Sequence, residues 1–250
     1  MDHYASLCKW LAAELNELVW KCPTILRDSR QIVKDLKDIK VPRSPTILTF
    51  DVVPLYPNIN HEIAKANIFT FFKNQAKGQC VLDLLDVVME NNIISYENKM
   101  WCQVVGIDMG TPVAPTYANL FLCKLENDIL KEVKTQPLYY KRFIDDGFLI
   151  WNCHLNDLAH FLHLWGNTYP SIKITSSPLE AQEATILDLS ISIDVEREDE
   201  NGMCPILMKS WDNPLNTHLY IHFSSYCPKY LFKGFIIGRF QRVQRVQRVY

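Results

Sequence analysis

Three aspartates in this sequence could together hold a divalent metal ion. Asp145 and Asp146 interrupt a run of aromatic and branched residues, YYKRFIDDGFLIW, at 139–151. Asp51 lies near the end of the apolar stretch TILTFDVV (46–53), where an acid has no packing role. A carboxylate among apolar neighbours must be paired or bound to metal, and three acids that meet repel one another unless a cation neutralises them. We therefore predict a site for Mg²⁺, which prefers oxygen ligands.

The chemistry that such a site could perform is phosphoryl transfer. Two Mg²⁺ ions about 3.5–4 Å apart can stabilise both the attacking and the leaving oxygen of this reaction. One ion would activate the 3′-hydroxyl of a primer, and the other would carry the triphosphate. An Asp-Asp-Gly sequence is by itself also a common polar turn, so the prediction depends on Asp51 meeting the pair.

The segments that carry these acids have the composition of strands. Residues 46–53 are rich in β-branched side chains and end at Pro54, which has no amide hydrogen to continue a ladder. The stretch 139–151 predicts a hairpin in which Asp-Asp-Gly forms the turn and Gly147 takes a positive φ. A strand end and a hairpin tip are therefore expected to meet at one edge of a sheet.

The remaining elements follow from hydrophobic periodicity and capping residues. Predicted helices cover 4–20, 29–39, 61–75 after an N-cap at Asn60, 81–91, a long segment capped by Thr111 with Pro112 and Pro115 in its first turn, and 157–165. Predicted strands form a hairpin within 93–106 and lie near 171–175, 185–195 and 205–211. This order predicts the α+β class, with an antiparallel sheet backed by helices.

The composition is that of a folded globular protein. Of 250 residues, 48% are apolar and 22% are charged, which argues against a disordered chain. No apolar run approaches the length of about 20 residues that spans a bilayer, and the N-terminus does not resemble a signal peptide. We expect an intracellular protein without a membrane partner, whose eight scattered cysteines are free thiols.

Basic charge is concentrated in the C-terminal part of the chain. Residues 205–250 carry seven Lys or Arg against one acid, a charge of +6. Since the net charge of the chain is −2, the rest of the chain carries −8. Such a tail suits phosphate binding, although it could equally be a solvated basic helix. Four arginines are the candidate nucleic-acid contacts: Arg239, Arg242, Arg245 and Arg248.

From about Cys22 to Arg242 the chain resembles reverse transcriptases, specifically those of Penelope-like retroelements. TFDVVPLYPNI (49–59) resembles the first palm motif of that family, GIDMGTPVAPTYANLFL (106–122) the second, and KRFIDDGFLIW (141–151) the third. TILDLSISI (185–193) and the tail segment from 218 resemble downstream regions peculiar to Penelope-like elements.

The resemblance implies an RNA-directed DNA polymerase with a palm-like antiparallel sheet and a basic C-terminal helical segment. Asp51, Asp145 and Asp146 would be its catalytic residues and the ligands of two Mg²⁺ ions. RNA template, DNA primer and deoxynucleotides would be its partners, and the nucleus its location. The predicted regions are a helical remnant (1–45), the palm (46–200) and a connection or thumb-like segment (201–250).

The resemblance also gives roles to neighbouring residues. Tyr56 matches the aromatic position under the incoming sugar, and Gly110 a position where a side chain would block base or template. Gln103 could bind template or the start of the next helix, Lys173 could protonate pyrophosphate, and Phe143 could contact the primer terminus. The alternatives are ordinary: strand-end packing for Tyr56, a helix-entry glycine for Gly110, and exposed polar residues for Gln103 and Lys173.

The sequence departs from the family at several points. Phe143 stands where the family usually has Tyr, and Asp108 where it prefers a small residue. The fingers motif resembling LPKIHK and the GIY-YIG endonuclease have no counterpart, which predicts an incomplete copy. Two alternatives therefore stay open: a non-catalytic remnant that binds nucleic acid through a helix-turn-helix-like basic tail, and a product that barely folds.

Overall fold

The structure is a computed structural model that describes residues 2–179 and 181–211, together with 228, 230–234, 236–238 and 240. The chain divides into two compact units. Unit 1 consists of Met1–Ile25 and Phe50–Ser176, and unit 2 of Leu26–Thr49 and Ser177–Tyr250. The predicted division at residues 45 and 200 separates motif regions rather than compact units, and it stays a prediction.

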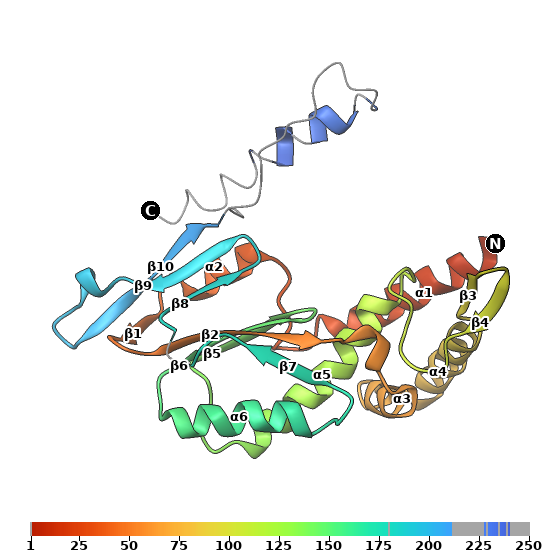
Figure 1. Cartoon of the computed structure of the whole chain (residues 1–250), viewed down its shortest axis with the longest axis horizontal. Coiled ribbons are helices and arrows are strands. Elements are labelled where there is room, and N and C mark those ends of the chain that lie inside the picture. Colours follow the sequence, from red (N-terminus) through yellow and green to blue (C-terminus); the bar gives the residue numbers. More distant parts are fainter. Residues whose placement is uncertain are drawn as a thin grey trace. The chain divides into compact units, whose positions relative to one another are not determined.

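Unit 1 contains most of the helices and the sheet that carries the three aspartates (Figure 1). Its helices are α1 (Asp2–Val19), η1 (Tyr56–Asn58), α3 (His61–Phe69), α4 (Gln75–Glu90), α5 (Ala114–Glu132) and α6 (Leu155–Asn167). Its strands are β3 (Ile93–Tyr96), β4 (Lys99–Cys102), β5 (Tyr139–Phe143), β6 (Asp146–Trp151) and β7 (Lys173–Ser176), with β2 (Thr46–Val53) entering from unit 2.

The central sheet has the strand order β5-β6-β2-β7. The antiparallel register between β2 and β7 pairs Asp51 with Thr175, and the register of the β5–β6 hairpin pairs Phe143 with Asp146. Because successive side chains of a strand point to opposite faces, the sheet has two distinct faces. We call the face with Asp51 and Asp146 the acidic face, and the face with Phe50 and Arg142 the helix face.

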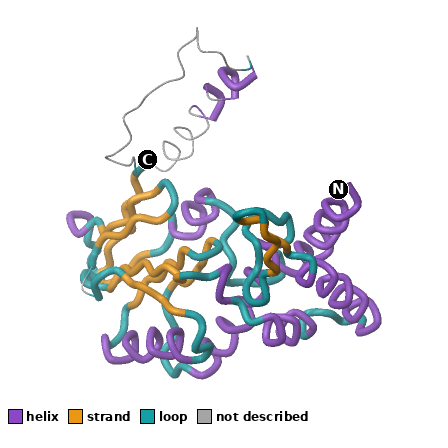
Figure 2. The backbone as a smooth tube through the Cα atoms, turned by 45° about the vertical axis from the view of Figure 1, so that its right-hand side comes forward, coloured by secondary structure: helices purple, strands orange, loops and turns teal. Residues whose placement is uncertain are grey.

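The helix face is buried against aromatic side chains of α6. The Phe50 ring lies 5.0 Å from the Trp165 ring, and the Tyr140 ring lies 5.8 Å from the Phe161 ring, measured between centroids. Phe50, Phe161 and Trp165 are all buried. Figures 1 and 2 show α6 running along this sheet. Burial of each large aromatic side chain contributes roughly 1.5–3 kcal/mol, so this layer fixes the position of β2 and β5.

Unit 2 is a smaller α+β arrangement. Its elements are α2 (Ser29–Leu36), β1 (Lys40–Pro42), β8 (Glu183–Ile186), β9 (Leu189–Ile193), η2 (Val195–Arg197) and β10 (Met203–Ser210). The four strands form an antiparallel sheet in the order β1-β10-β9-β8. The Lys40 ammonium donates to the Asp199 carboxylate at 2.8 Å, which links the first strand to the acidic loop that precedes β10.

The structure confirms the α+β class and most of the predicted elements. Strand β2 has the predicted bounds, and the Asn60 side chain accepts from the Ile63 amide as the N-cap of α3. Two predictions were wrong. The N-cap of α5 is Val113 rather than Thr111, whose hydroxyl instead donates to the Asp108 carbonyl. The single strand predicted at 185–195 is the β8–β9 hairpin, whose turn holds Leu187 at φ 54°.

No helix among the described residues is long and apolar enough to cross a membrane. The four arginines predicted to contact nucleic acid, at 239, 242, 245 and 248, lie outside the described residues. The helix-turn-helix prediction for the tail therefore stays a prediction.

Candidate metal site

The turn of the β5–β6 hairpin differs from the prediction. Its residues are Ile144 and Asp145, and Ile144 adopts the left-handed φ of 57°. A β-branched residue in this region is strained and uncommon. Gly147 lies within β6 opposite Arg142, and it is required for a different reason: a Cβ there would lie 2.2 Å from the Phe50 ring.

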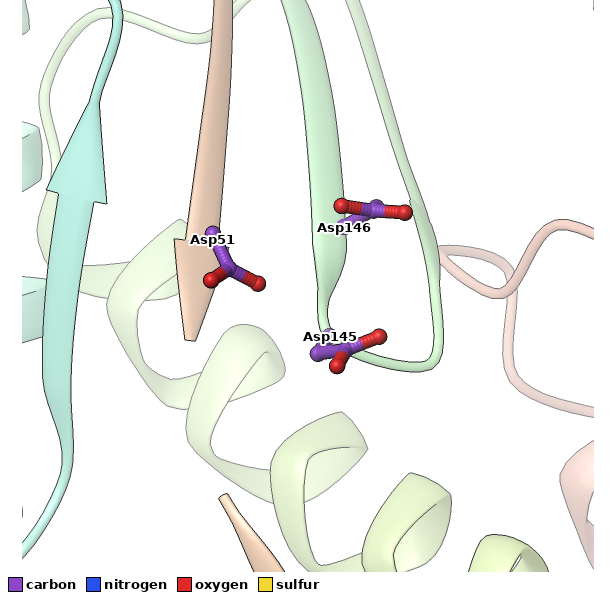
Figure 3. A group of neighbouring side chains, drawn as sticks. All are labelled: Asp51, Asp145 and Asp146. Atoms are coloured by element: carbon purple, nitrogen blue, oxygen red, sulfur yellow. The ribbon is translucent and has the colours of Figure 1, made fainter. Parts of the chain in front are cut away.

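Asp51, Asp145 and Asp146 come together at the end of β2 and the start of β6 (Figure 3). One carboxylate oxygen from each of the three lies within 4.8 Å of the others. The backbone fixes this approach, because the Val52 amide donates to the Asp145 carbonyl at 3.1 Å. Asp51 thus forms one cluster with the adjacent pair Asp145 and Asp146, from which it is distant in sequence.

The electrostatics of the cluster are unfavourable without a cation. Burial raises the pKa of Asp51 above its ordinary value, and the Asp145 charge raises it further. Burial also raises the pKa of Asp146, and Asp145 and Asp51 add to that shift. Within the part of the chain that the structure describes, no Lys or Arg forms an ion pair with any of the three. Like charges therefore crowd together with no cationic side chain to compensate them.

The donor set suits a hard divalent cation. Three carboxylates offer only oxygen ligands, and all three side chains remain partly accessible, which leaves room for water and phosphate. Mg²⁺ is bound in this way by one or more carboxylates together with substrate phosphates. The residues present therefore fit the predicted ion.

Two predicted nucleotide and primer contacts lie beside the cluster. Tyr56 opens the short helix η1, and its pKa is raised first by burial and then by the nearby Asp145 charge. Phe143 is the cross-strand partner of Asp146, so its half-buried ring lies on the acidic face. Their roles toward the sugar and the primer terminus stay predictions.

Lys173 lies on the same face of the sheet. It is the first residue of β7 and the partner of Val53, two residues from the Thr175 that pairs with Asp51. Since residues two apart on a strand share a face, the exposed Lys173 side chain belongs to the acidic face. This is where a proton donor to pyrophosphate is predicted.

Gly110 and Gln103 occupy the connection between β4 and α5. The Gly110 amide donates to the Asp108 carboxylate at 3.1 Å, and a Cβ at Gly110 would lie 3.2 Å from that carboxylate. The Gln103 side chain accepts from Asn92 and donates to the Val105 carbonyl. It lines a cavity of about 370 Å³ whose lining includes none of the three aspartates. The contacts of Gln103 are thus local, and its predicted role at the template stays a prediction.

The sequence analysis missed the charged groups beneath the hairpin. Arg142 and Glu126 form an ion pair with both side chains 0% exposed. Two signals point to this pair: Glu126 follows the apolar run ANLFLCKL of α5, and Arg142 stands among strand-forming aromatics. A charge in such surroundings needs a partner, the same reasoning that singled out Asp51.

No protein-family model matches the chain, and no curated protein matches it. Solved structures of similar fold include the apo telomerase of Candida tropicalis truncated from its C-terminal domain, with a TM-score of 0.58 and 13% identity over 75% of this chain and 43% of that one. Another apo telomerase structure from that organism has a TM-score of 0.60 and 12% identity over 76% of this chain and 39% of that one. Candida albicans telomerase in complex with a fragment of telomeric RNA has a TM-score of 0.58 and 12% identity over 74% of this chain and 37% of that one.

The chain thus spans less than half the length of these telomerase chains. At identities of 12–13% the likeness shows a shared fold alone. The described structure has a polymerase-like fold, and what it does must be argued from its own residues.

Proposed function

We propose that this chain is the palm of an RNA-directed DNA polymerase that joins nucleotides with two Mg²⁺ ions, and that it derives from a Penelope-like retroelement. The polymerase-like fold supports the first part of the proposal. The motifs at 49–59, 106–122 and 141–151, which occur in the order of that family, support the second.

One observation carries the proposal: the meeting of Asp51 with Asp145 and Asp146 on the acidic face. A turn alone would explain the adjacent pair, but it would not explain an acid in the buried strand β2 directed at that pair. Crowded carboxylates with raised pKa values cost stability. A cost of this kind is typical of functional sites.

The three aspartates would hold the two Mg²⁺ ions. When bound, these ions supply activation of the primer 3′-hydroxyl and stabilisation of charge on the departing pyrophosphate. Around them, the Tyr56 ring would support the deoxyribose and exclude a ribose 2′-hydroxyl, and the Phe143 ring would pack against the primer terminus. Lys173 would donate a proton to the pyrophosphate, and Gly110 would leave space for the base or template.

The contacts of Asp108 support a local role for this unusual residue. Its carboxylate accepts from the Gly110 amide, and its carbonyl accepts from the Thr111 hydroxyl at 2.9 Å. Both bonds shape the loop that leads into α5. We infer that Asp108 stabilises this loop, so its charge is engaged locally rather than directed at the triphosphate.

Primer extension tests the proposal. The chain, Asp145→Asn and the matched control Asp83→Asn would be compared on an RNA template with a DNA primer, deoxynucleotides and Mg²⁺. Asp83 is a suitable control because it is an exposed acid of α4 whose carboxylate accepts from the Gln79 side chain of the same helix. We expect Asp145→Asn to lower the rate by about 10²–10³-fold, the range for loss of a single transition-state electrostatic contact, and Asp83→Asn to leave it unchanged.

Equal, background-level incorporation by all three proteins would overturn catalysis by this chain. In that case, nucleic-acid binding that weakens steeply with salt and is lost on deletion of 238–250 would support the alternative of a non-catalytic remnant with a basic tail. That alternative concerns residues outside the described ones. The nuclear location and the RNA, primer and nucleotide partners belong to the same proposal.

A further inference from the structure

The pair formed by Arg142 and Glu126 is unusual because it is completely buried. Both side chains are 0% exposed, although a buried ion pair often contributes no more to stability than well-packed apolar residues of similar volume. Burial lowers the pKa of Arg142, but the Glu126 carboxylate outweighs that effect and holds the pKa above its ordinary value. The guanidinium therefore stays charged in the interior, and its presence needs an explanation beyond packing.

Glu126 is the hub of a satisfied network. Its carboxylate accepts from the Arg142 guanidinium through both oxygens, from the Tyr140 hydroxyl at 2.7 Å and from the Thr24 hydroxyl. Burial raises the pKa of Tyr140 well above its ordinary value, and the Glu126 charge raises it further, so the hydroxyl remains a donor. Helix α5 is thus joined to β5 and to the segment after α1.

The same guanidinium reaches the turn that carries the aspartates. Its Nη1 donates to the Ile144 carbonyl and, at 2.9 Å, to the Asn119 side chain of α5. Ile144 is the residue with the left-handed φ of 57°, a conformation that costs of order 1–3 kcal/mol and persists only when its surroundings hold it. A charge-assisted hydrogen bond to its carbonyl is a contact that can do so.

The turn is therefore held from two sides. Arg142 binds the Ile144 carbonyl from the helix face, and the Val52 amide of β2 binds the next carbonyl, that of Asp145. Between these two contacts the chain reverses, and this places Asp145 and Asp146 beside Asp51 (Figure 3). The buried network holds this turn through Arg142 and Ile144, and the acidic cluster begins at the next residues, Asp145 and Asp146.

From this geometry we infer that Arg142, fixed by Glu126, Tyr140 and Asn119, is a positioning residue for the metal site: it locks the Ile144–Asp145 turn so that the three carboxylates converge. The inference rests on the proposed function insofar as the converging carboxylates bind metal. Arg142 acts through the turn and does not touch metal or substrate. A purely structural pair, which only attaches α5 to the sheet, is the competing explanation.

A paired substitution separates the two explanations. Arg142→Met alone leaves the buried Glu126 charge uncompensated and endangers the fold. Arg142→Met combined with Glu126→Gln removes both charges together, leaves an amide oxygen to accept from Tyr140, and deletes the donors to the Ile144 carbonyl and to Asn119. Lys124→Met combined with Asp128→Asn is the matched control, because it removes a partly exposed ion pair of the same helix α5 whose two side chains pair with each other.

Two measurements are made on each protein. Binding of Mn²⁺ alone, followed by the loss of the free-ion electron paramagnetic resonance signal, reports the metal site. Hydrogen exchange of the Val52 amide, followed by nuclear magnetic resonance, reports the turn without any metal. We expect the variant with Arg142→Met and Glu126→Gln to bind Mn²⁺ about 10–100-fold more weakly, the range for loss of a residue that orients metal ligands. Its Val52 amide should exchange faster, and the control with Lys124→Met and Asp128→Asn should match the unaltered chain.

Wild-type Mn²⁺ affinity and Val52 exchange in a folded double variant with Arg142→Met and Glu126→Gln would overturn the positioning role and leave the pair purely structural. If the unaltered chain itself binds no Mn²⁺, or Asp145→Asn binds it equally well, the proposed function fails instead. The positioning role is then judged by exchange alone: faster exchange of Val52 in the double variant supports it, and unchanged exchange overturns it.

Discussion

The two faces of the central sheet treat charge in opposite ways. On the helix face, Arg142 and Glu126 are fully buried, and the Glu126 carboxylate accepts hydrogen bonds from Arg142, Tyr140 and Thr24. On the acidic face, Asp51 and Asp146 are partly exposed, close to a third carboxylate, and their pKa values are raised. The comparison teaches that a charge is fully buried where a partner compensates it, and that the acids without a cationic partner stay partly accessible to water. The distinguishing property is whether the charge is compensated.

The largest expected effect comes from removing one partner of the buried ion pair on the helix face. Arg142→Met should lower the free energy of unfolding by about 3–5 kcal/mol, because it leaves the Glu126 carboxylate buried without a cation. Urea unfolding of the variant and of the unaltered chain measures this difference. A loss below about 1 kcal/mol would mean that Glu126 finds water or another partner, and the contrast between the faces would be weaker than the geometry implies.

A smaller loss is expected from overpacking the helix face. Gly147→Ala should destabilise the fold by about 1–3 kcal/mol, the usual cost of overpacking, because the new Cβ would lie 2.2 Å from the Phe50 ring. Gly166→Ala in α6 is the matched control, since nothing lies within 4 Å of a Cβ there. Thermal unfolding should show the control equal to or above the unaltered chain, as Ala favours helix over Gly.

On the acidic face a substitution should stabilise the fold while removing function. Asp146→Asn relieves repulsion by Asp145 and Asp51, and the gain should stay below about 1 kcal/mol because solvent screens these partly exposed groups. Mg²⁺ should raise the melting temperature of the unaltered chain more than that of the variant. A destabilised variant, or an equal response to Mg²⁺, would contradict the view that these carboxylates are uncompensated.

The smallest effect is the pH dependence of that gain. Because the folded-state pKa values of Asp51 and Asp146 are raised, protonation favours the fold, and this contribution is fully present below the ordinary carboxyl pKa of 3.8. It is lost as the pH rises through the raised values. The stability difference between Asp146→Asn and the unaltered chain should therefore grow from acid to neutral pH without Mg²⁺, as measured by urea unfolding at several pH values.

Sequence reasoning succeeded where the signal was local. The strand at 46–53 was predicted with its bounds, and Asp51 was identified because an acid in an apolar strand needs a charged partner or a metal ion. It failed where the cause lies far away in the chain. Gly147 was expected to supply a positive φ, but Ile144 has it, and Gly147 is needed because of Phe50, which is 97 positions earlier.

The same limit explains the other misses. Thr111 is a good capping residue, but its hydroxyl is engaged by Asp108, and α5 begins after Val113. The stretch 185–195 has strand-like composition throughout, and only the turn conformation of Leu187 divides it into β8 and β9. The conformational preference of a single residue does not reveal either outcome. The start of α5 depends on the contact with Asp108, and the division of 185–195 depends on how the two strands pair.

The contact between Gly147 and Phe50 has an evolutionary consequence. The two positions share one small volume, so a larger residue at 147 becomes tolerable only when the residue at 50 shrinks. In lineages descended from a common ancestor of this chain, these positions should change together or not at all. Gly147 would then be retained wherever Phe50 is retained, even in descendants that lose the three aspartates.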